Sequence, residues 1–255
     1  MPMPRGFIMA VLVIASQKGG VGKTGFAISI TQYLSEFLEK RCLYIPLDNQ
    51  GGSANRAFNL KSNHKVLNGM FFNEEYDIQT VSEYIDSVSS NRTIHQLDRT
   101  DLEEAMIFAN EIKSLSKKYD HIIIDTPPGL GARITAAILA ADKIIVPVEC
   151  EASAVEGMME LKDTIRKLNR FNPKAKMNVL VINKYTGTHE QKEIFEFLAA
   201  KFEKEIIDIP LKYLQPIKTA TTAGRPVWQQ KKNGNERVAG KLVKSVISRI
   251  FEKVL

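Results

Sequence analysis

The stretch Val11-Leu12-Val13-Ile14-Ala15-Ser16-Gln17-Lys18-Gly19-Gly20-Val21-Gly22-Lys23-Thr24 decides the fold of this chain. An apolar run over Phe7–Ser16 predicts a buried strand, and apolar residues at helical spacing over Thr24–Lys40 predict an amphipathic helix. Between them lies a glycine-rich loop ending in Gly-Lys-Thr, the ending of a phosphate-binding loop. Its first glycine is replaced by Gln17, and a second lysine, Lys18, follows. The sequence therefore predicts a nucleoside triphosphate site in this loop.

The residue types of the loop match what triphosphate binding requires. Glycines let backbone N–H groups point at phosphate oxygens, and the start of the following helix adds the positive end of its dipole. Lys23 is placed for the β- and γ-phosphates, and the Thr24 hydroxyl is placed for Mg²⁺. The expected nucleotide-binding residues of the loop are Gly19, Gly20, Val21, Gly22, Lys23, Thr24 and Gly25.

The rest of the chain alternates strand-like and helix-like segments. This alternation predicts an α/β fold, with a mostly parallel, doubly wound central sheet and helices on both faces. The segment Gly51–Asn91 is polar and has no clean period, so short strands and loops are expected there. With no repeat, low-complexity tract or linker visible, we expect one domain over residues 1–255. Further strands are predicted at Cys42–Leu47, His121–Thr126, Lys143–Val148, Met177–Asn183 and Glu205–Ile209.

Composition restricts the class of protein without naming it. The formal net charge of +6 and the pI of about 9.1 are compatible with a polyanionic partner. Cys42 and Cys150 form no CxxC pattern, so they are expected to be reduced core thiols. Arg5 and the apolar run after it resemble a signal peptide, but the phosphate loop follows at once and requires that run as its strand. We expect a cytoplasmic protein.

The segment Lys18–Thr24 resembles the deviant Walker A motif of the ParA/MinD family of dimeric ATPases. The resemblance implies that the chain binds ATP with Mg²⁺, forms a homodimer on ATP binding and hydrolyses ATP to ADP and phosphate. It implies that Lys18 reaches across the dimer to the partner's phosphates, as an arginine finger does. Gly25 stands where relatives often carry a second hydroxyl residue, which predicts weaker nucleotide affinity.

The segment Leu43–Ala54 resembles the D-x-D-P-Q-G-N segment of that family. Asp48 matches the second aspartate, which implies that it positions the attacking water. Pro46 stands in place of the first aspartate and Asn49 in place of the proline. With Lys18 and Lys23, Asp48 completes the expected catalytic set, and the loss of the first carboxylate leaves the hydrolysis rate open.

Two later segments resemble the family at its metal site and its dimer face. The segment Ile122–Gly129 resembles the Walker B strand, which implies that Asp125 holds Mg²⁺ through a water. The segment Val146–Gly157 resembles the strand, turn and helix at the dimer face. Glu151 there matches a position that contacts the partner's nucleotide.

The resemblance also implies residues that contact the base. Asn183, after an apolar strand, matches the asparagine that binds the adenine edge, although it could instead cap a helix or turn. Pro210 begins the segment that closes over the base in this family.

The segment Ala223–Val227 resembles the xGxPV motif of ParA, which favours a DNA partition ATPase without an N-terminal helix-turn-helix domain. The resemblance implies that the ATP-bound dimer binds double-stranded DNA without sequence preference. A ParB-like, centromere-binding partner would stimulate slow hydrolysis and release the nucleoid-associated protein. The expected DNA-contacting residues are Lys212, Lys218, Arg225, Lys241, Lys244 and Arg249. The basic residues Lys231, Lys232 and Arg237 belong to the same C-terminal patch.

Three alternatives stay open at this stage. A MinD-like, membrane-cycling ATPase would use the last helix, whose apolar stripe runs from Leu242 to Leu255, although a helix packed on the sheet explains the same stripe. A reductase relative would share an iron–sulfur cluster, but Cys42 and Cys150 lack neighbouring thiols. A nucleotide-binding scaffold without hydrolysis is compatible with Pro46.

Overall fold

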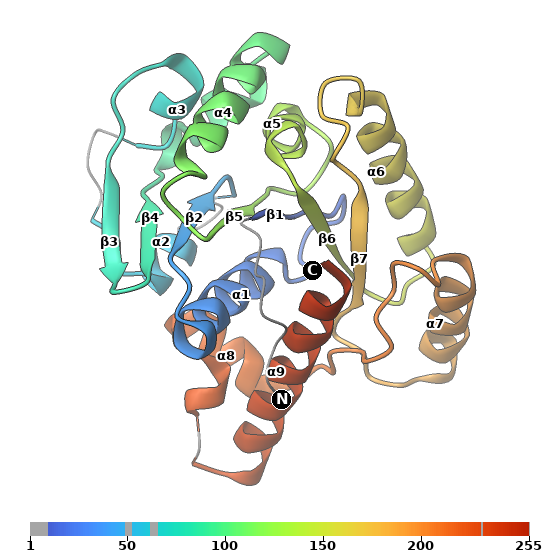
Figure 1. Cartoon of the computed structure of the whole chain (residues 1–255). Helices are drawn as coiled ribbons and strands as arrows, with labels where there is room; N and C mark the ends of the chain where they lie inside the picture. The colour runs from blue at the N-terminus through green and yellow to red at the C-terminus, as the bar shows by residue number, and fades with distance from the viewer. Residues whose placement is uncertain (1–9, 49–52, 62–65, 231, 255) are drawn as a thin grey trace.

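The computed structural model describes residues 10–48, 53–61, 66–230 and 232–254; the predicted positions Phe7–Met9, Asn49, Lys231 and Leu255 lie outside these ranges. Within them, a seven-stranded sheet with the order β3-β4-β2-β5-β1-β6-β7 forms the middle layer (Figure 1). The pairing of β3 with β4 is antiparallel and the other pairings are parallel, which confirms the predicted α/β sheet. The strands are β1 (Ala10–Ile14), β2 (Cys42–Pro46), β3 (Ile78–Ser82), β4 (Ile85–Val88), β5 (His121–Asp125), β6 (Lys143–Val148) and β7 (Met177–Ile182).

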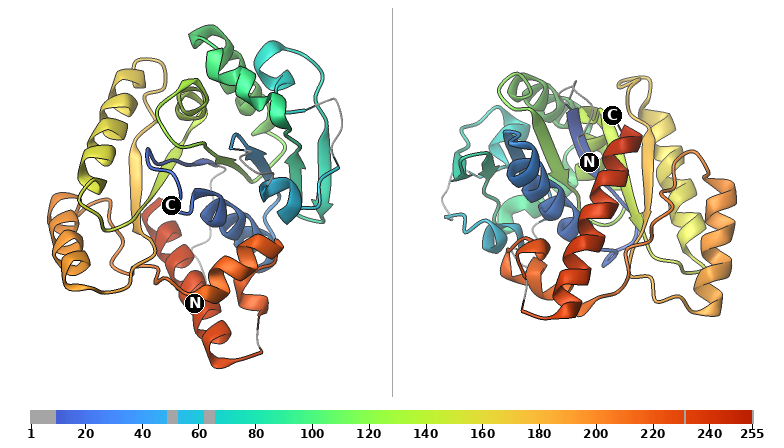
Figure 2. Two further views of the ribbon diagram at one scale, coloured as in Figure 1. Left: turned by 180° about the vertical axis from the view of Figure 1, so that it is seen from behind. Right: turned by 60° about the horizontal axis from the view of Figure 1, so that its bottom comes forward.

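Helices cover both faces of the sheet, and each face has its own apolar core. Helices α4, α5 and α6 pack on one face, and α1, α8 and α9 pack on the other (Figures 1 and 2). Strands buried on both faces are mainly apolar, as β1 is throughout and β5 is over Ile122, Ile123 and Ile124. The helices are α1 (Lys23–Leu38), α2 (Ser53–Ala57), α3 (Gly69–Phe72), α4 (Leu102–Leu115), α5 (Ala132–Ala140), α6 (Ala154–Leu168), α7 (His189–Lys201), α8 (Gln215–Ala223), α9 (Gly234–Val254) and the 3₁₀ helices η1 (Arg92–Arg99) and η2 (Val227–Gln229).

The predicted strand Glu205–Ile209 is wrong. This segment makes a single bridge to the edge strand β7, between Leu180 and Ile206. Beyond the bridge, Asp208 binds Arg249 of α9, and Pro210 has no N–H to donate to a ladder. Past the bridge, the next backbone hydrogen bond to β7 among the described residues is from the N–H of Leu211 to the oxygen of Ile182 at 2.8 Å, so the segment runs beside β7 without a continuous ladder. The irregular region before residue 91 contains short strands, as expected, in the antiparallel pair β3 and β4, and it also contains two short helices, α2 and α3, that were not expected.

The register of three parallel strands brings the predicted site residues to one edge of the sheet. Ile14 of β1 and Pro46 of β2 both lie opposite Asp125 of β5. Because parallel strands end at the same edge, the loops that follow them meet there. The phosphate loop follows β1, Asp48 follows β2, and Asp125 ends β5.

The last helix packs on the sheet through its apolar face. Phe251 stacks on Tyr33 of α1, with ring centroids 6.3 Å apart. The apolar stripe is therefore covered in this chain, and the alternative of an in-plane membrane helix loses its main support. Among the described residues, no helix combines the length and apolar character needed to cross a membrane. The buried members of the stripe are Val243, Val246, Ile247, Ile250, Phe251 and Val254.

Truncation in this stripe should measure what α9 contributes to the fold. Ile250 is fully buried, so we expect Ile250→Ala to lower the free energy of unfolding by about 2–5 kcal/mol in urea denaturation. The exposed Ser245 on the same helix is the matched control, and Ser245→Ala should change it by less than about 0.5 kcal/mol. Equal effects of the two substitutions would show that α9 is not part of the core.

Candidate active site

The phosphate loop adopts a backbone that only glycine accommodates at its last turn. Gly22 has a φ of 93°, and a Cβ on it would lie 2.4 Å from Nδ2 of Asn183. Helix α1 begins at the next residue without a side-chain cap. Its first N–H groups are therefore free of a capping side chain and available to an anion.

Lys23 is held inside this loop. Its side chain is buried, and its Nζ donates to the backbone oxygen of Lys18 at 3.1 Å. Burial lowers the pKa of Lys23, while the charges of Asp125 and Asp48 oppose that shift. Lys23 therefore lies within electrostatic reach of both carboxylates, so these three predicted site residues are close to one another.

Asp125 is fully buried at the end of β5, and burial raises its pKa to about 7. The hydroxyl of Tyr44 donates to Oδ2 at 3.1 Å. Oδ1 has no hydrogen-bond partner among the described residues, and the nearby Thr24 side chain lowers the carboxyl pKa. An unsatisfied carboxylate oxygen beside a threonine hydroxyl fits the oxygen ligands and waters that Mg²⁺ prefers.

Tyr44 is a site residue that the sequence reasoning missed. It lies on β2 among apolar residues, and burial raises its pKa well above the ordinary value, so it remains a hydrogen-bond donor. Because Tyr44 binds Oδ2 of Asp125, Oδ1 is the oxygen that would face a bound cation or its water. A tyrosine in an otherwise aliphatic strand, two residues before Pro46, was the available signal.

Asp48 begins the loop after β2 and is half-buried. The backbone N–H groups of Leu47 and Asp48 both donate to the carbonyl oxygen of Asp125, at 2.8 and 3.2 Å. The charge of Asp48 also affects the pKa of Lys23, Tyr44 and Asp125, which places this carboxylate beside the phosphate loop.

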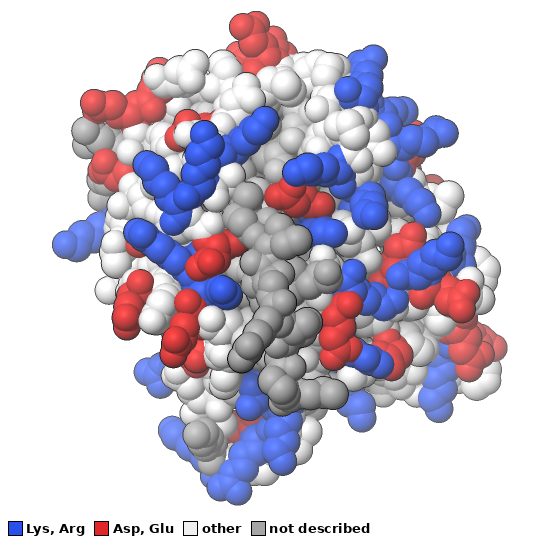
Figure 3. Space-filling view, in the orientation of Figure 1, with Lys and Arg blue, Asp and Glu red and all other residues white. Residues whose placement is uncertain are grey.

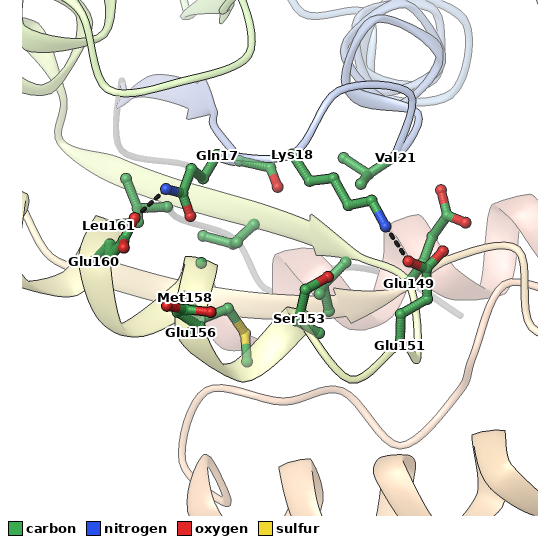
Figure 4. Close-up of a pocket in the computed structure, with 15 residues that line it drawn as sticks. Gln17, Lys18, Val21, Glu149, Glu151, Ser153, Glu156, Met158, Glu160 and Leu161 are labelled. Carbon is green, nitrogen blue, oxygen red and sulfur yellow. Dashed lines mark hydrogen bonds and ion pairs between the residues drawn. The ribbon is translucent and has the colours of Figure 1, made fainter.

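Lys18 extends away from its own phosphate loop (Figure 4). Its Nζ forms an ion pair with Glu151, and Gln17 donates to Glu160 of α6. These side chains lie along a groove of about 490 Å³ between the loop and α6. Glu151, expected at a partner's nucleotide, therefore holds Lys18 within this single chain. An exposed lysine on a surface groove is accessible to a second molecule.

Asn183 binds the phosphate loop itself. Its Nδ2 donates to the backbone oxygen of Val21 at 2.7 Å, in place of a helix or turn cap. Asn183 lines a second pocket, of about 360 Å³, together with Gly20 and Gly22. Of the segment expected to close over a base, Leu211 and Lys212 line this pocket, as do Tyr213 and Lys218.

The predicted DNA-contacting residues do not form one uniform set. Lys212 and Lys218 line the pocket beside the phosphate loop. Arg249 is bound by Asp208 and Glu252, so its charge is already balanced. Lys244 lies over the ring of Phe37, 5.2 Å from its centroid. Arg225 and Lys241 are exposed, as are Lys232 and Arg237 between them.

The raised pKa of Asp125 predicts how stability varies with pH in the absence of nucleotide and metal. A carboxyl whose pKa rises from 3.8 to about 7 on folding favours the fold at low pH, and that contribution is lost as the pH rises through about 7. Asp125→Asn should therefore be more stable than the wild type at pH 8, by up to about 4 kcal/mol, and the gap should shrink toward pH 5.

Urea denaturation at the two pH values measures this gap. The exposed Asp163 provides the control, since Asp163→Asn should leave no comparable difference. A gap for Asp125→Asn that does not change with pH would contradict the prediction.

Comparison with known sequences gives independent support for the family resemblance. The AAA_31 family model, described as an AAA domain, matches residues 9–178. The chain is 29% identical over 266 residues to protein IncC of Escherichia coli, covering 96% of this chain and 70% of that protein. It is 26% identical over 231 residues to the chromosome partitioning protein ParA of Myxococcus xanthus, covering 85% and 80%.

Solved structures share the fold. The ATP complex of McdA from Cyanothece superposes with a TM-score of 0.82 at 18% identity, covering 96% of this chain and 98% of that one. A plasmid partition protein from Borrelia burgdorferi superposes with a TM-score of 0.72 at 23% identity, covering 95% and 99%. At this identity the structural likeness establishes the fold.

Proposed function

We propose that this chain, which belongs to the ParA/MinD family of ATPases, couples ATP binding to dimerisation and thereby to a reversible hold on DNA. The observation that carries the proposal is Lys18. Lys18 belongs to the phosphate loop, yet its side chain points out to a surface groove and pairs with Glu151. Its backbone oxygen, and not its side chain, binds Lys23. A cation in this position can serve a nucleotide held by a second copy of the chain.

Within one subunit the remaining residues supply an ATP site. Lys23 and the backbone of the phosphate loop would bind the phosphates, while Thr24 and Asp125 would hold Mg²⁺ through its oxygen and water ligands. Bound Mg²⁺ would neutralise charge on the phosphates. Asp48 would orient the water that attacks the γ-phosphate, giving ADP and phosphate. Glu151, once released by Lys18, would contact the partner's nucleotide.

The second pocket would hold the nucleoside. It is lined by Gly22 of the phosphate loop and by Asn183, which follows β7. A triphosphate bound in the loop would therefore place its base in this pocket. Lys212 and Lys218 line this pocket, so they would contact the nucleotide rather than a distant DNA surface.

The DNA surface would lie around the α8–α9 connection. Figure 3 shows blue side chains gathered at the lower tip of the molecule, over this connection. Among the described residues of this connection and of the first turns of α9, the exposed basic side chains are Arg225, Lys232, Arg237 and Lys241. A dimer would present this surface twice, and two linked surfaces that bind phosphates together raise affinity without base reading. By analogy with the partition proteins among the relatives, the chain would be a cytoplasmic, nucleoid-bound ATPase stimulated by a ParB-like partner.

Retention on random-sequence duplex tests the proposal when measured with ATP, with ADP and without nucleotide. We expect stronger retention with ATP that falls as salt rises, because binding to phosphates releases counterions. Lys18→Ala should bind ATP as the wild type does and should not show this increase. The pair Arg237→Gln with Lys241→Gln should keep ATP-dependent dimerisation and lower the salt slope by about one unit for each substituted side chain that binds a phosphate.

The matched control is Lys192→Gln on α7, which removes an exposed lysine at the far edge of the sheet. It should leave retention unchanged. Equal retention in all three nucleotide states would refute the DNA proposal, and co-sedimentation with anionic liposomes on ATP addition would favour the membrane alternative instead.

A further inference from the structure

Arg133 is a buried arginine close to the catalytic carboxylate. It lies in the first turn of α5 and is 5% exposed. Its Nη1 donates to the backbone oxygen of Leu47 at 2.7 Å, across a sequence separation of 86 residues. Its Nε and Nη2 donate to the two carboxylate oxygens of Asp98, at 2.7 and 3.1 Å. Burying a guanidinium destabilises the fold unless its N–H donors are hydrogen-bonded, as they are here.

The peptide that Arg133 binds is the one that carries Asp48. On its other side, the N–H groups of Leu47 and Asp48 donate to the carbonyl oxygen of Asp125. Pro46, which precedes them, has neither an N–H nor a polar side chain with which to anchor the loop. Besides the bond from the Leu47 N–H to the oxygen of Ile45 at 3.2 Å, this backbone is bound to Asp125 on one side and to Arg133 on the other.

Arg133 also stands at the end of a segment that contacts the phosphate loop. Residues 126–131 connect Asp125 to α5, and the N–H of Gly129 donates to the backbone oxygen of Gln17 at 2.8 Å. This segment therefore connects the phosphate loop, through one hydrogen bond, to the start of α5. From there, Arg133 reaches Asp48 through the carbonyl of Leu47.

We propose that Arg133 is a positioning residue for ATP hydrolysis. It holds Asp48 where that carboxylate orients the attacking water, and Asp98 fixes the orientation of the guanidinium. This role depends on the one proposed above for Asp48. It requires that Arg133 affect the rate of hydrolysis and leave nucleotide affinity nearly unchanged, because none of its described hydrogen bonds lies in the phosphate loop or the nucleoside pocket.

Arg133→Lys tests this role in the full-length chain. A lysine ammonium cannot bind Asp98 with two parallel bonds and reach Leu47 at the same time. We expect kcat for ATP to fall roughly 10- to 100-fold, as for a misplaced reacting group, and the Kd of a fluorescent ATP analogue to change less than about threefold. The Asp98 side chain is half-exposed, so we expect the fold to tolerate its substitution. Asp98→Asn should also lower kcat.

The matched controls come from an exposed pair on α6. Arg166 binds Asp163 at 2.6 Å, and its side chain is 79% exposed. Arg166→Lys and Asp163→Asn should leave kcat and Kd at wild-type values. A wild-type kcat for Arg133→Lys, or a loss of affinity as large as the loss of rate, would overturn the inference.

A double variant separates positioning from a general structural effect. If Arg133 acts through Asp48, Asp48→Ala combined with Arg133→Lys should hydrolyse ATP no more slowly than Asp48→Ala alone. Losses that multiply would contradict the inference while leaving the role of Asp48 intact. Rapid hydrolysis by Asp48→Ala alone would instead contradict the proposed function.

Discussion

The parallel pairing of β1, β2 and β5 is the constraint on which the site depends. Because Ile14, Pro46 and Asp125 lie opposite one another, the three loops that follow start from the same edge of the sheet. The phosphate loop, the loop of Asp48 and the loop toward α5 therefore meet without any long-range adjustment. The two cores on either face keep these strands buried, which makes their register hard to shift by even one residue.

The same edge gathers two buried ionisable side chains, Lys23 and Asp125. Burial lowers the pKa of Lys23 and raises that of Asp125, so it disfavours the ionised form of each side chain. A triphosphate would pair with the lysine, and a divalent cation would pair with the carboxylate. Nucleotide and metal are thus expected to relieve an electrostatic cost already present in the fold, which connects the stability of the chain to its ligands.

The fold and the core of the site were predictable because both follow from local patterns. The apolar runs placed β2, β5, β6 and β7 to within one residue and the end of β1 to within two, but they gave no bounds for β3 and β4. The strand predicted at Glu205–Ile209 is reduced to a single bridge beside β7. The hydrogen bonds of Tyr44 and Arg133 were not predictable, since their partners are 81 and 86 residues away in the sequence. Asn183 was predicted as a site residue, but its bond to Val21 depends on the packing of β7 beside the loop.

The claim that Lys18 serves the nucleotide of a second chain is tested most directly by mixing two inactive variants. Lys18→Ala retains Asp48, and Asp48→Ala retains Lys18, so a mixed dimer contains one complete site and one site that lacks both groups. Mixing equal amounts should restore ATPase activity to about one quarter of the wild-type value, since half of the dimers are mixed and half of their sites are complete. Activity that stays at the sum of the two separate variants would show that Lys18 acts within its own chain, and would contradict the account.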